Sequence, residues 1–102
     1  MKNIFLIACV FLVLSACTSP GMVEELQQGK ITFDAGDYQK AFHQLLPVAV
    51  NGNKEAQYAV GYMYYNGLGV ALDTETGIVW MKKSADQHYQ PAVDAVKVLK
   101  AR

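Results

Sequence analysis

Residues 56–92 read AQYAVGYMYYNGLGVALDTETGIVWMKKSADQHYQPA, and this stretch decides the fold. Its small and apolar residues recur with the three-to-four-residue spacing of helices, whereas the alternation typical of strands is absent. The Gly-Leu-Gly segment at 67–69 divides the stretch, because glycine adopts the left-handed backbone conformation in which many helices end. The sequence therefore predicts two helices, about Lys54–Asn66 and Thr74–Gln87, joined by a reversal of the chain.

Three further helices are expected outside this hairpin. They cover about 23–35, 38–51 and 91–100. Asp37, Asn53 and Asp73 each precede a predicted helix and are suited to cap it, since their side-chain oxygens can accept hydrogen bonds from the first turn. Pro47 lies deep in the helix over 38–51, where it removes a backbone hydrogen bond, so a kink or a break is expected there.

The chain also repeats itself at a spacing of 36 residues, which is typical of helical repeat arrays. The aligned pairs are Ala41 with Gly77, Leu45 with Met81, Ala49 with Ala85, and Ala56 with Ala92. All of these positions are small or apolar. Such a match is expected if each copy buries the same face against its neighbour.

Ten residues of the stretch fit a known repeat pattern: Ala56, Gly61, Tyr64, Gly67, Gly69, Val70, Asp73, Trp80, Lys83 and Ala85. With these residues the stretch resembles the Sel1-like repeat, a longer relative of the tetratricopeptide repeat. The resemblance implies an all-α fold, a short α-solenoid of two antiparallel helix pairs with a capping helix at the C-terminal end. It also implies that Gly61 and Gly77 lie where paired helices approach closely, with Tyr64 filling the gap between them. His88 stands where the family usually has a helix-ending glycine.

The N-terminus predicts a lipid anchor. Lys2 precedes an apolar run, Ile4 to Leu14, that is too short for the roughly 20 residues of a transmembrane helix. Residues 14–17, Leu-Ser-Ala-Cys, resemble a bacterial lipobox, which implies cleavage before Cys17 and its acylation. We therefore expect a signal peptide over 1–16, a lipidated tether over 17–22 and the repeat domain over 23–102. A plain secreted protein with an incidental cysteine is the alternative.

The same resemblance implies a location in the bacterial cell envelope. By analogy with lipoprotein sorting in Gram-negative bacteria, Thr18 in place of Asp after the lipidated cysteine favours the periplasmic leaflet of the outer membrane. Two or three acyl chains, each contributing about 0.8 kcal/mol per buried methylene, would hold such a protein stably on that leaflet.

Composition excludes several kinds of chemistry. Cys9 would leave with the leader and Cys17 would carry lipid, so the mature domain has no thiol for catalysis, a disulfide or a metal. Loss of Lys2 would leave eight basic against nine acidic residues, a balance that does not attract nucleic acid. His43 and His88 lie on separate segments without neighbouring metal ligands, and no catalytic triad or phosphate-binding motif is present. We therefore expect no enzyme, no metal and no cofactor.

A face of aromatic residues is the strongest candidate for function. Tyr58, Tyr62 and Tyr65 share one face of their helix, and the first predicted helix carries residues at the same spacing. Because the first helix of each pair lines the concave surface in related solenoids, the resemblance implies a groove with these residues on its floor and rim. The candidate partner-binding residues are Leu26, Lys30, Phe33, Glu55, Tyr58, Tyr62, Tyr65 and Asn66. The alternative is that these rings simply cover a small core.

The leading hypothesis is a non-enzymatic adaptor on the envelope membrane that binds a peptide or a helix of another protein. Aromatic residues with a polar tip are frequent in such interfaces. A structural accessory subunit of a larger envelope complex and a host-interaction lipoprotein are the alternatives. Arrays of this kind usually need three or more repeats, so self-association is a further expectation. The identity of the protein partner stays open.

Overall fold

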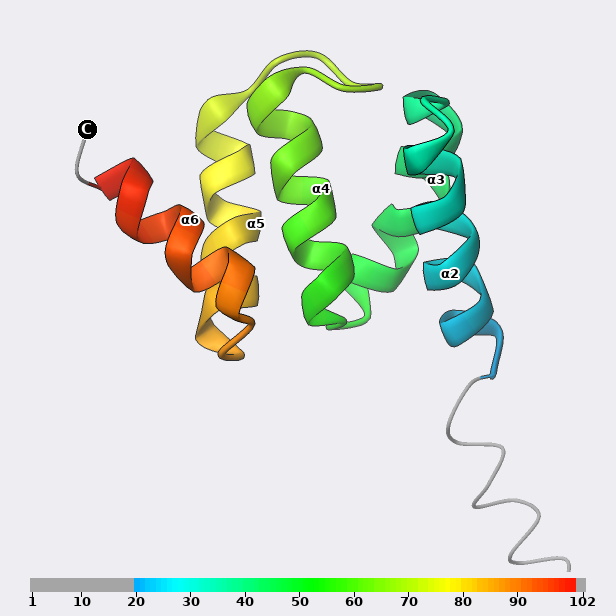
Figure 1. Ribbon diagram of the computed structural model, residues 1–102, viewed down its shortest axis with the longest axis horizontal. Helices are drawn as coiled ribbons and strands as arrows, with labels where there is room; N and C mark the ends of the chain where they lie inside the picture. Colours follow the sequence, from blue (N-terminus) through cyan, green and yellow to red (C-terminus); the bar gives the residue numbers. More distant parts are fainter. Residues whose placement is uncertain (1–19, 101–102) are drawn as a thin grey trace, which may run out of the picture.

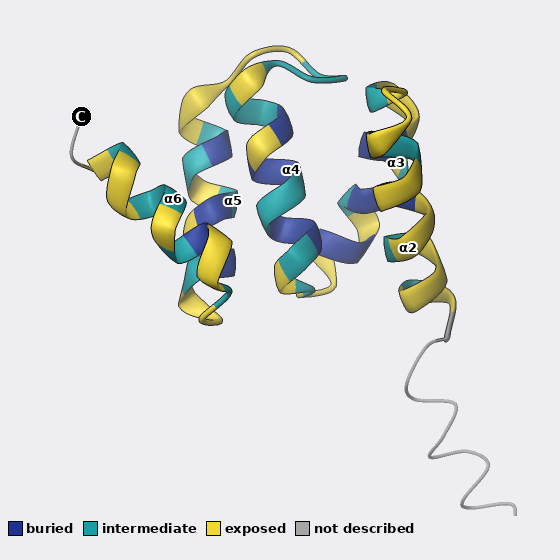
Figure 2. Ribbon diagram, in the orientation of Figure 1, coloured by how far each residue is buried: buried dark blue, intermediate teal, exposed yellow. Residues whose placement is uncertain are grey.

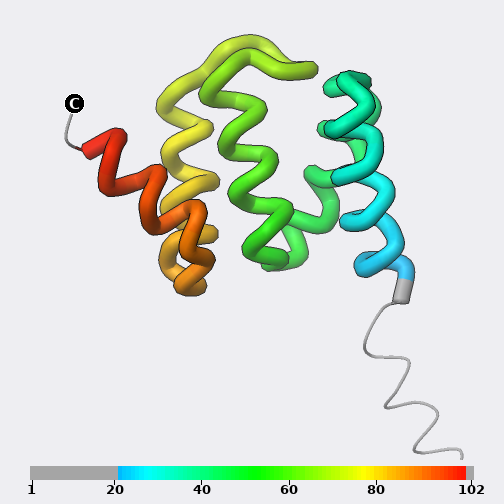
Figure 3. The backbone as a smooth tube through the Cα atoms, in the orientation of Figure 1, coloured from blue at the N-terminus to red at the C-terminus, as the bar shows by residue number. Residues whose placement is uncertain are grey.

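The structure, a computed structural model, describes residues 20–100 and contains five helices and no strand in that range (Figure 1). The helices are α2 (Pro20–Asp34), α3 (Tyr38–Val50), α4 (Lys54–Asn66), α5 (Thr74–Asp86) and α6 (Gln90–Lys100). Each helix packs against the next one in the chain, and the row of helices is clearest in the backbone trace (Figure 3). The predicted all-α fold is confirmed: it is a short α-solenoid of two antiparallel pairs, α2/α3 and α4/α5, followed by α6.

The first helix begins earlier than the sequence predicts. Residues 20–22, which we expected in the tether, form the first turn of α2. Proline is compatible with this position, because the N–H group that it lacks would have no partner in the first turn of a helix. The predicted tether therefore ends before Pro20. Residues 1–19, including the predicted signal peptide and Cys17, lie outside the described residues.

The three predicted N-caps are confirmed. Asp37 accepts a hydrogen bond from the backbone N–H of Lys40 at 3.4 Å, and Asn53 accepts one from Ala56 at 2.9 Å. The carboxylate of Asp73 accepts from the N–H of Thr76 at 3.1 Å. These bonds satisfy donors that have no partner inside a helix, so each cap fixes where its helix begins.

His88 takes over the role of the expected glycine in the turn between α5 and α6. Its φ angle is +62°, the left-handed conformation that side chains other than glycine rarely adopt. The N–H of His88 donates to the carbonyl of Ala85 at 2.9 Å, which helps to close the end of α5. The chain therefore reverses between α5 and α6 with a histidine in the left-handed conformation.

The core lies between the two helix pairs (Figure 2). It consists of Ala41, Phe42, Leu45, Val48, Ala49, Ala56, Val60 and Met63, all buried. α3 supplies the first five of these residues and α4 the other three. α3 passes through Pro47 without a break, so the break that we considered there is wrong. Pro47 lies in the last turn of α3, where the loss of one backbone hydrogen bond disturbs little of the helix.

Tyr64 packs differently from the prediction. We expected it between α4 and α5, but its ring meets Phe42 of α3 edge-on, with ring centroids 5.4 Å apart. The two backbones of α4 and α5 touch at Gly61 and Gly77, which leaves no room for an aromatic ring between them. Tyr64 therefore joins the core on the side of α3.

Candidate partner-binding surface

The first helices of the two pairs, α2 and α4, meet at one surface of the solenoid. Lys30 of α2 donates a hydrogen bond to Glu55 of α4, with Nζ and Oε2 3.0 Å apart. Further along, the rings of Phe33 and Tyr62 meet edge-on with centroids 6.2 Å apart. The structure thus brings together four of the candidate residues, two from each helix.

The Lys30–Glu55 ion pair lies at the rim of this surface and contributes little to the stability of the fold. The hydrogen bond and the charge of Glu55 raise the pKa of Lys30. The two side chains are 50% and 38% exposed, however, and such solvent-exposed pairs contribute only about 0.2–1 kcal/mol to stability. The ion pair therefore marks one end of the surface with a pair of opposite charges that a partner can contact.

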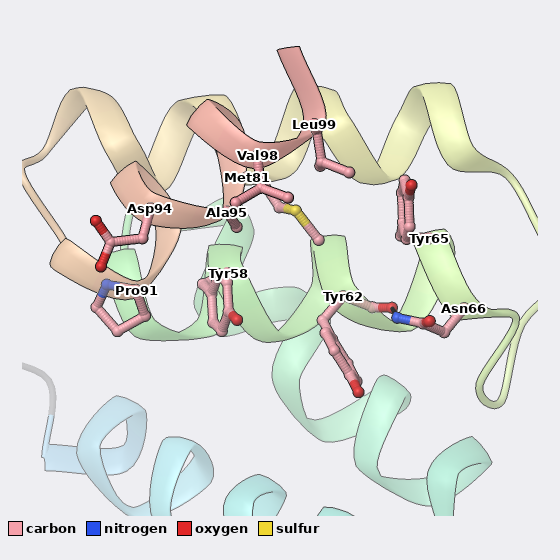
Figure 4. A pocket seen from close by; sticks show the side chains of 10 residues that line it. All are labelled: Tyr58, Tyr62, Tyr65, Asn66, Met81, Pro91, Asp94, Ala95, Val98 and Leu99. Carbon is pink, nitrogen blue, oxygen red and sulfur yellow. Dashed lines mark hydrogen bonds between the residues drawn. The ribbon is translucent and has the colours of Figure 1, made fainter. Parts of the chain in front are cut away.

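Two adjoining hollows lie along the tyrosines of α4. The smaller has a volume of about 270 Å³ and lies between α2 and α4, where Phe33, Tyr58, Ala59 and Tyr62 line it. The larger has a volume of about 370 Å³ and lies between α4 and α6 (Figure 4). Its lining comprises Tyr58, Tyr62, Tyr65 and Asn66 from α4, Met81 from α5, and Pro91, Asp94, Ala95, Val98 and Leu99 from α6. We call the surface that carries both hollows the tyrosine face.

Tyr58 and Tyr62 line both hollows and so join them into one surface. Their ring centroids are 6.4 Å apart, and the ring of Tyr89 meets that of Tyr58 edge-on, with centroids 5.8 Å apart. Partial burial raises the pKa of Tyr58, and the nearby Tyr62 and Tyr89 raise it further. The Tyr58 hydroxyl therefore stays protonated and can both donate and accept hydrogen bonds at neutral pH.

The sequence left two interpretations of the candidate residues open, a partner-binding groove or a covered core, and the structure gives the surroundings of each residue. Tyr58, Tyr62 and Tyr65 line the hollows, and Tyr62 is 40% exposed. Leu26 lines neither hollow and packs against the core, so the structure does not bring it together with the tyrosines. The reason is the rotation of α2: Gly29, three residues later, is buried against Leu45 of α3, and Leu26 shares that face of the helix. Phe33 contributes to both the core and the smaller hollow.

The contribution of α6 was missed, although the sequence carries a signal for it. The C-terminal helix was expected only to cap the solenoid, yet five of its residues line the larger hollow. At the repeat spacing of 36 residues, Asp94 corresponds to Tyr58 and Val98 to Tyr62. Extending the internal repeat into the last helix would therefore have placed both residues on the surface that the tyrosines share.

The chemistry of the tyrosine face is apolar with few charges. Asp94 is the one charged side chain in the larger hollow, and Gln90 donates a hydrogen bond to its carboxylate at 2.8 Å. No cluster of three or more His, Cys, Asp or Glu side chains suited to a metal ion occurs within residues 20–100. In the same range, none of the helices is both long and apolar enough to cross a membrane. The described surface is thus equipped for contact with another apolar surface.

Residues 54–89 match the family model of the Sel1 repeat. The chain carries a Sel1 repeat. A Sel1 repeat protein from Oxalobacter formigenes, known from a crystal structure, superimposes on 76% of this chain with a TM-score of 0.72 and 27% sequence identity. This chain spans 24% of the length of that protein. Sel1 repeats generally mediate protein–protein interactions, and Sel1 repeat proteins are typically non-catalytic.

Proposed function

We propose that this Sel1 repeat protein is a membrane-anchored adaptor that binds a peptide segment or a helix of another envelope protein on its tyrosine face. The observation that carries the proposal is the joining of two hollows by Tyr58 and Tyr62, with Tyr65 extending the larger one. Tyrosine offers a large apolar ring and a hydroxyl at a low entropic cost, which suits it to recognition of a protein segment.

The lining of the hollows indicates the kind of segment that fits. Aromatic and aliphatic side chains supply most of the surface, so the segment should place apolar side chains in both hollows. Asp94 favours a lysine or arginine in the segment near α6, because opposite charges across an interface direct its register. We also infer that the module has no catalytic activity of its own, since the lining offers no nucleophile with a base beside it.

The proposed anchor is the acylated Cys17, on the periplasmic leaflet of the outer membrane. The leader sequence and its lipobox support it. Replacement of Cys17 by serine removes the sulfur that would carry the diacylglycerol, so the variant should leave the membrane fraction. Cys9→Ser is the matched control, because Cys9 lies in the leader and its loss should change nothing. Recovery of Cys17→Ser in the membrane fraction at the wild-type level would contradict the anchor.

The test of the binding surface uses the double variant Tyr62→Ala/Tyr65→Ala in an envelope cross-linking pull-down. We expect partners captured by the wild type to be lost, because truncation removes the Tyr62 ring from both hollows and the Tyr65 ring from the larger one. The control is Val79→Ala, which alters a side chain 53% exposed on α5, and helical content by circular dichroism checks that each variant folds. Unchanged partners for a folded double variant would refute the role of the tyrosine face.

A further inference from the structure

We propose that one edge of the solenoid lies against the headgroup layer of the bilayer. This membrane edge consists of the first turn of α2 at residues 20–23, the end of α3 with the α3–α4 turn at residues 50–53, and the α5–α6 turn at residues 87–89, which all lie on one side of the molecule (Figure 1). The inference rests on the proposed acylation of Cys17, and it adds an orientation that the anchor alone does not define.

The three segments of the membrane edge are linked to one another. Met22 and Val23 of α2 line a hollow of about 330 Å³ together with the α3–α4 turn. The α3–α4 turn is also hydrogen-bonded to the α5–α6 turn, since the side chain of Gln87 donates to the carbonyl of Gly52 at 2.8 Å. An anchor attached next to α2 therefore positions all three segments and not α2 alone.

The short chain between Cys17 and α2 keeps this edge close to the lipid. Only Thr18 and Ser19 separate Cys17 from Pro20, where α2 begins. Three Cα–Cα steps of 3.8 Å span at most about 11 Å. The headgroup layer on one side of a bilayer is about 5–7 Å thick, so acyl chains on Cys17 would hold the start of α2 at or just above that layer.

The side chains at this edge suit an interface between water and lipid. Val23 is 72% exposed and Val50 is 68% exposed, and Pro47 is exposed in the last turn of α3. Exposed charges of both signs lie near the edge, with Glu24 on α2 and Lys54 at the start of α4. Because charges of opposite sign largely cancel, the edge has little net attraction to a charged headgroup. Apolar contact with the lipid would therefore stabilise this orientation.

This orientation fixes the height of the tyrosine face above the membrane. α4 starts at the membrane edge with Lys54 and runs to the opposite edge (Figure 1). At 1.5 Å per residue, Tyr58 lies about 6 Å, Tyr62 about 12 Å and Tyr65 about 16 Å from the start of α4. The tyrosine face would then open sideways, along the membrane, to a segment that its partner holds just above the lipid.

Two single-cysteine variants test the orientation. Val50→Cys lies on the membrane edge, and Leu72→Cys lies in the α4–α5 loop at the opposite edge with almost the same exposure, 68% against 67% for the native side chains. Acylation occupies Cys17 and processing removes Cys9, so the new thiol is the one that a fluorescent label can reach. The acylated, labelled proteins are reconstituted into vesicles whose lipids carry a spin-label quencher on the headgroup.

Because α4 separates the two labelled sites by about 18 Å, the label at Val50 should be quenched at least about twofold more than the label at Leu72. Equal or reversed quenching in vesicle-bound protein would overturn the orientation while the anchor stands. Absence of acylated protein from the vesicles would instead contradict the anchor and the orientation with it. Val23→Cys provides a second site on the membrane edge if the Val50 variant does not fold, and the same stronger quenching is expected there.

Discussion

Gly61 of α4 and Gly77 of α5 pack backbone against backbone. A Cβ atom on Gly61 would lie 2.7 Å from the carbonyl oxygen of Gly77, and a Cβ atom on Gly77 would lie 2.7 Å from that of Gly61. Both residues are buried. The contact fixes the rotation of α4 on α5, and thereby places Tyr62, the next residue of α4, on the exposed tyrosine face.

Replacement of Gly61 by alanine should destabilise the fold. Alanine gains about 1 kcal/mol over glycine inside a helix, but the added methyl group overpacks a contact that has no space for it, and overpacking typically costs about 1–3 kcal/mol. We therefore expect a lower urea midpoint with an unchanged slope. Gly21→Ala in the first turn of α2 is the control, since a Cβ atom there meets nothing within 4 Å. A rise in stability for both variants would contradict the backbone contact.

A hydrogen bond between the buried Gln57 and the exposed Gln87 should couple α4 to the end of α5. Gln57 is 6% exposed and donates to the carbonyl of Ala49 at 3.2 Å, while Gln87 donates to its Oε1 at 2.8 Å. Gln87→Ala leaves that oxygen without its donor, which should cost about 1–3 kcal/mol. Gln90→Ala, which removes an exposed side chain bonded to Asp94, should change the free energy of unfolding much less.

A double-mutant cycle on Gln57 and Gln87 measures this coupling by urea unfolding. Residues in one hydrogen-bond network show interaction energies of about 0.5–3 kcal/mol, so the double variant should lose less stability than the two single variants together. Strict additivity would mean that the two side chains act independently, against the geometry of the pair.

The cap at Asp73 should make part of the stability depend on pH. Hydrogen bonds from the hydroxyl and then the backbone N–H of Thr76 lower the pKa of Asp73 below 3.8. Because the folded state holds the carboxylate ionised, the cap stabilises the fold above pH 3.8, and this contribution disappears as the pH falls through the lower folded pKa. The difference in unfolding free energy between wild type and Asp73→Ala should therefore shrink between pH 6 and pH 3.

Asn53→Ala is the control for this pH dependence. Asn53 caps α4 as Asp73 caps α5, but its amide does not titrate. Its loss should cost about 1 kcal/mol at either pH. If the effect of Asp73→Ala stayed as constant with pH as that of Asn53→Ala, the carboxylate would not be acting as the ionised cap.

Local signals in the sequence were enough to place most of the fold. Each cap residue accepts hydrogen bonds from its own helix within three residues, so the starts of α3, α4 and α5 follow from short-range chemistry. The contact of Gly61 with Gly77 follows from the family pattern. The start of α2 was predicted at residue 23 rather than at Pro20, because a proline is compatible both with a turn and with the first position of a helix.

The tyrosine face was harder to predict because it depends on how helices rotate against one another. Helical spacing groups Tyr58, Tyr62 and Tyr65, which line one hollow together. The same spacing groups Leu26 with Lys30, but Leu26 packs against the core while Lys30 bonds to Glu55 of α4. Leu26 and Lys30 differ because α2 buries the side that carries Gly29 and Leu26 against α3, which is a tertiary contact. The spacing within one helix gives a shared face, and only packing decides whether that face is covered.

The most direct test of the central claim, that the tyrosine face binds a protein partner, is photocross-linking in living cells. A photoreactive amino acid replaces Tyr62 in one strain and Val79 in another; these native side chains are 40% and 53% exposed. We predict that position 62 yields a discrete cross-linked protein, identified by mass spectrometry, and that position 79 on α5 does not yield it. The same cross-linked protein at both positions, or none at 62 from a folded protein in the membrane fraction, would contradict the claim.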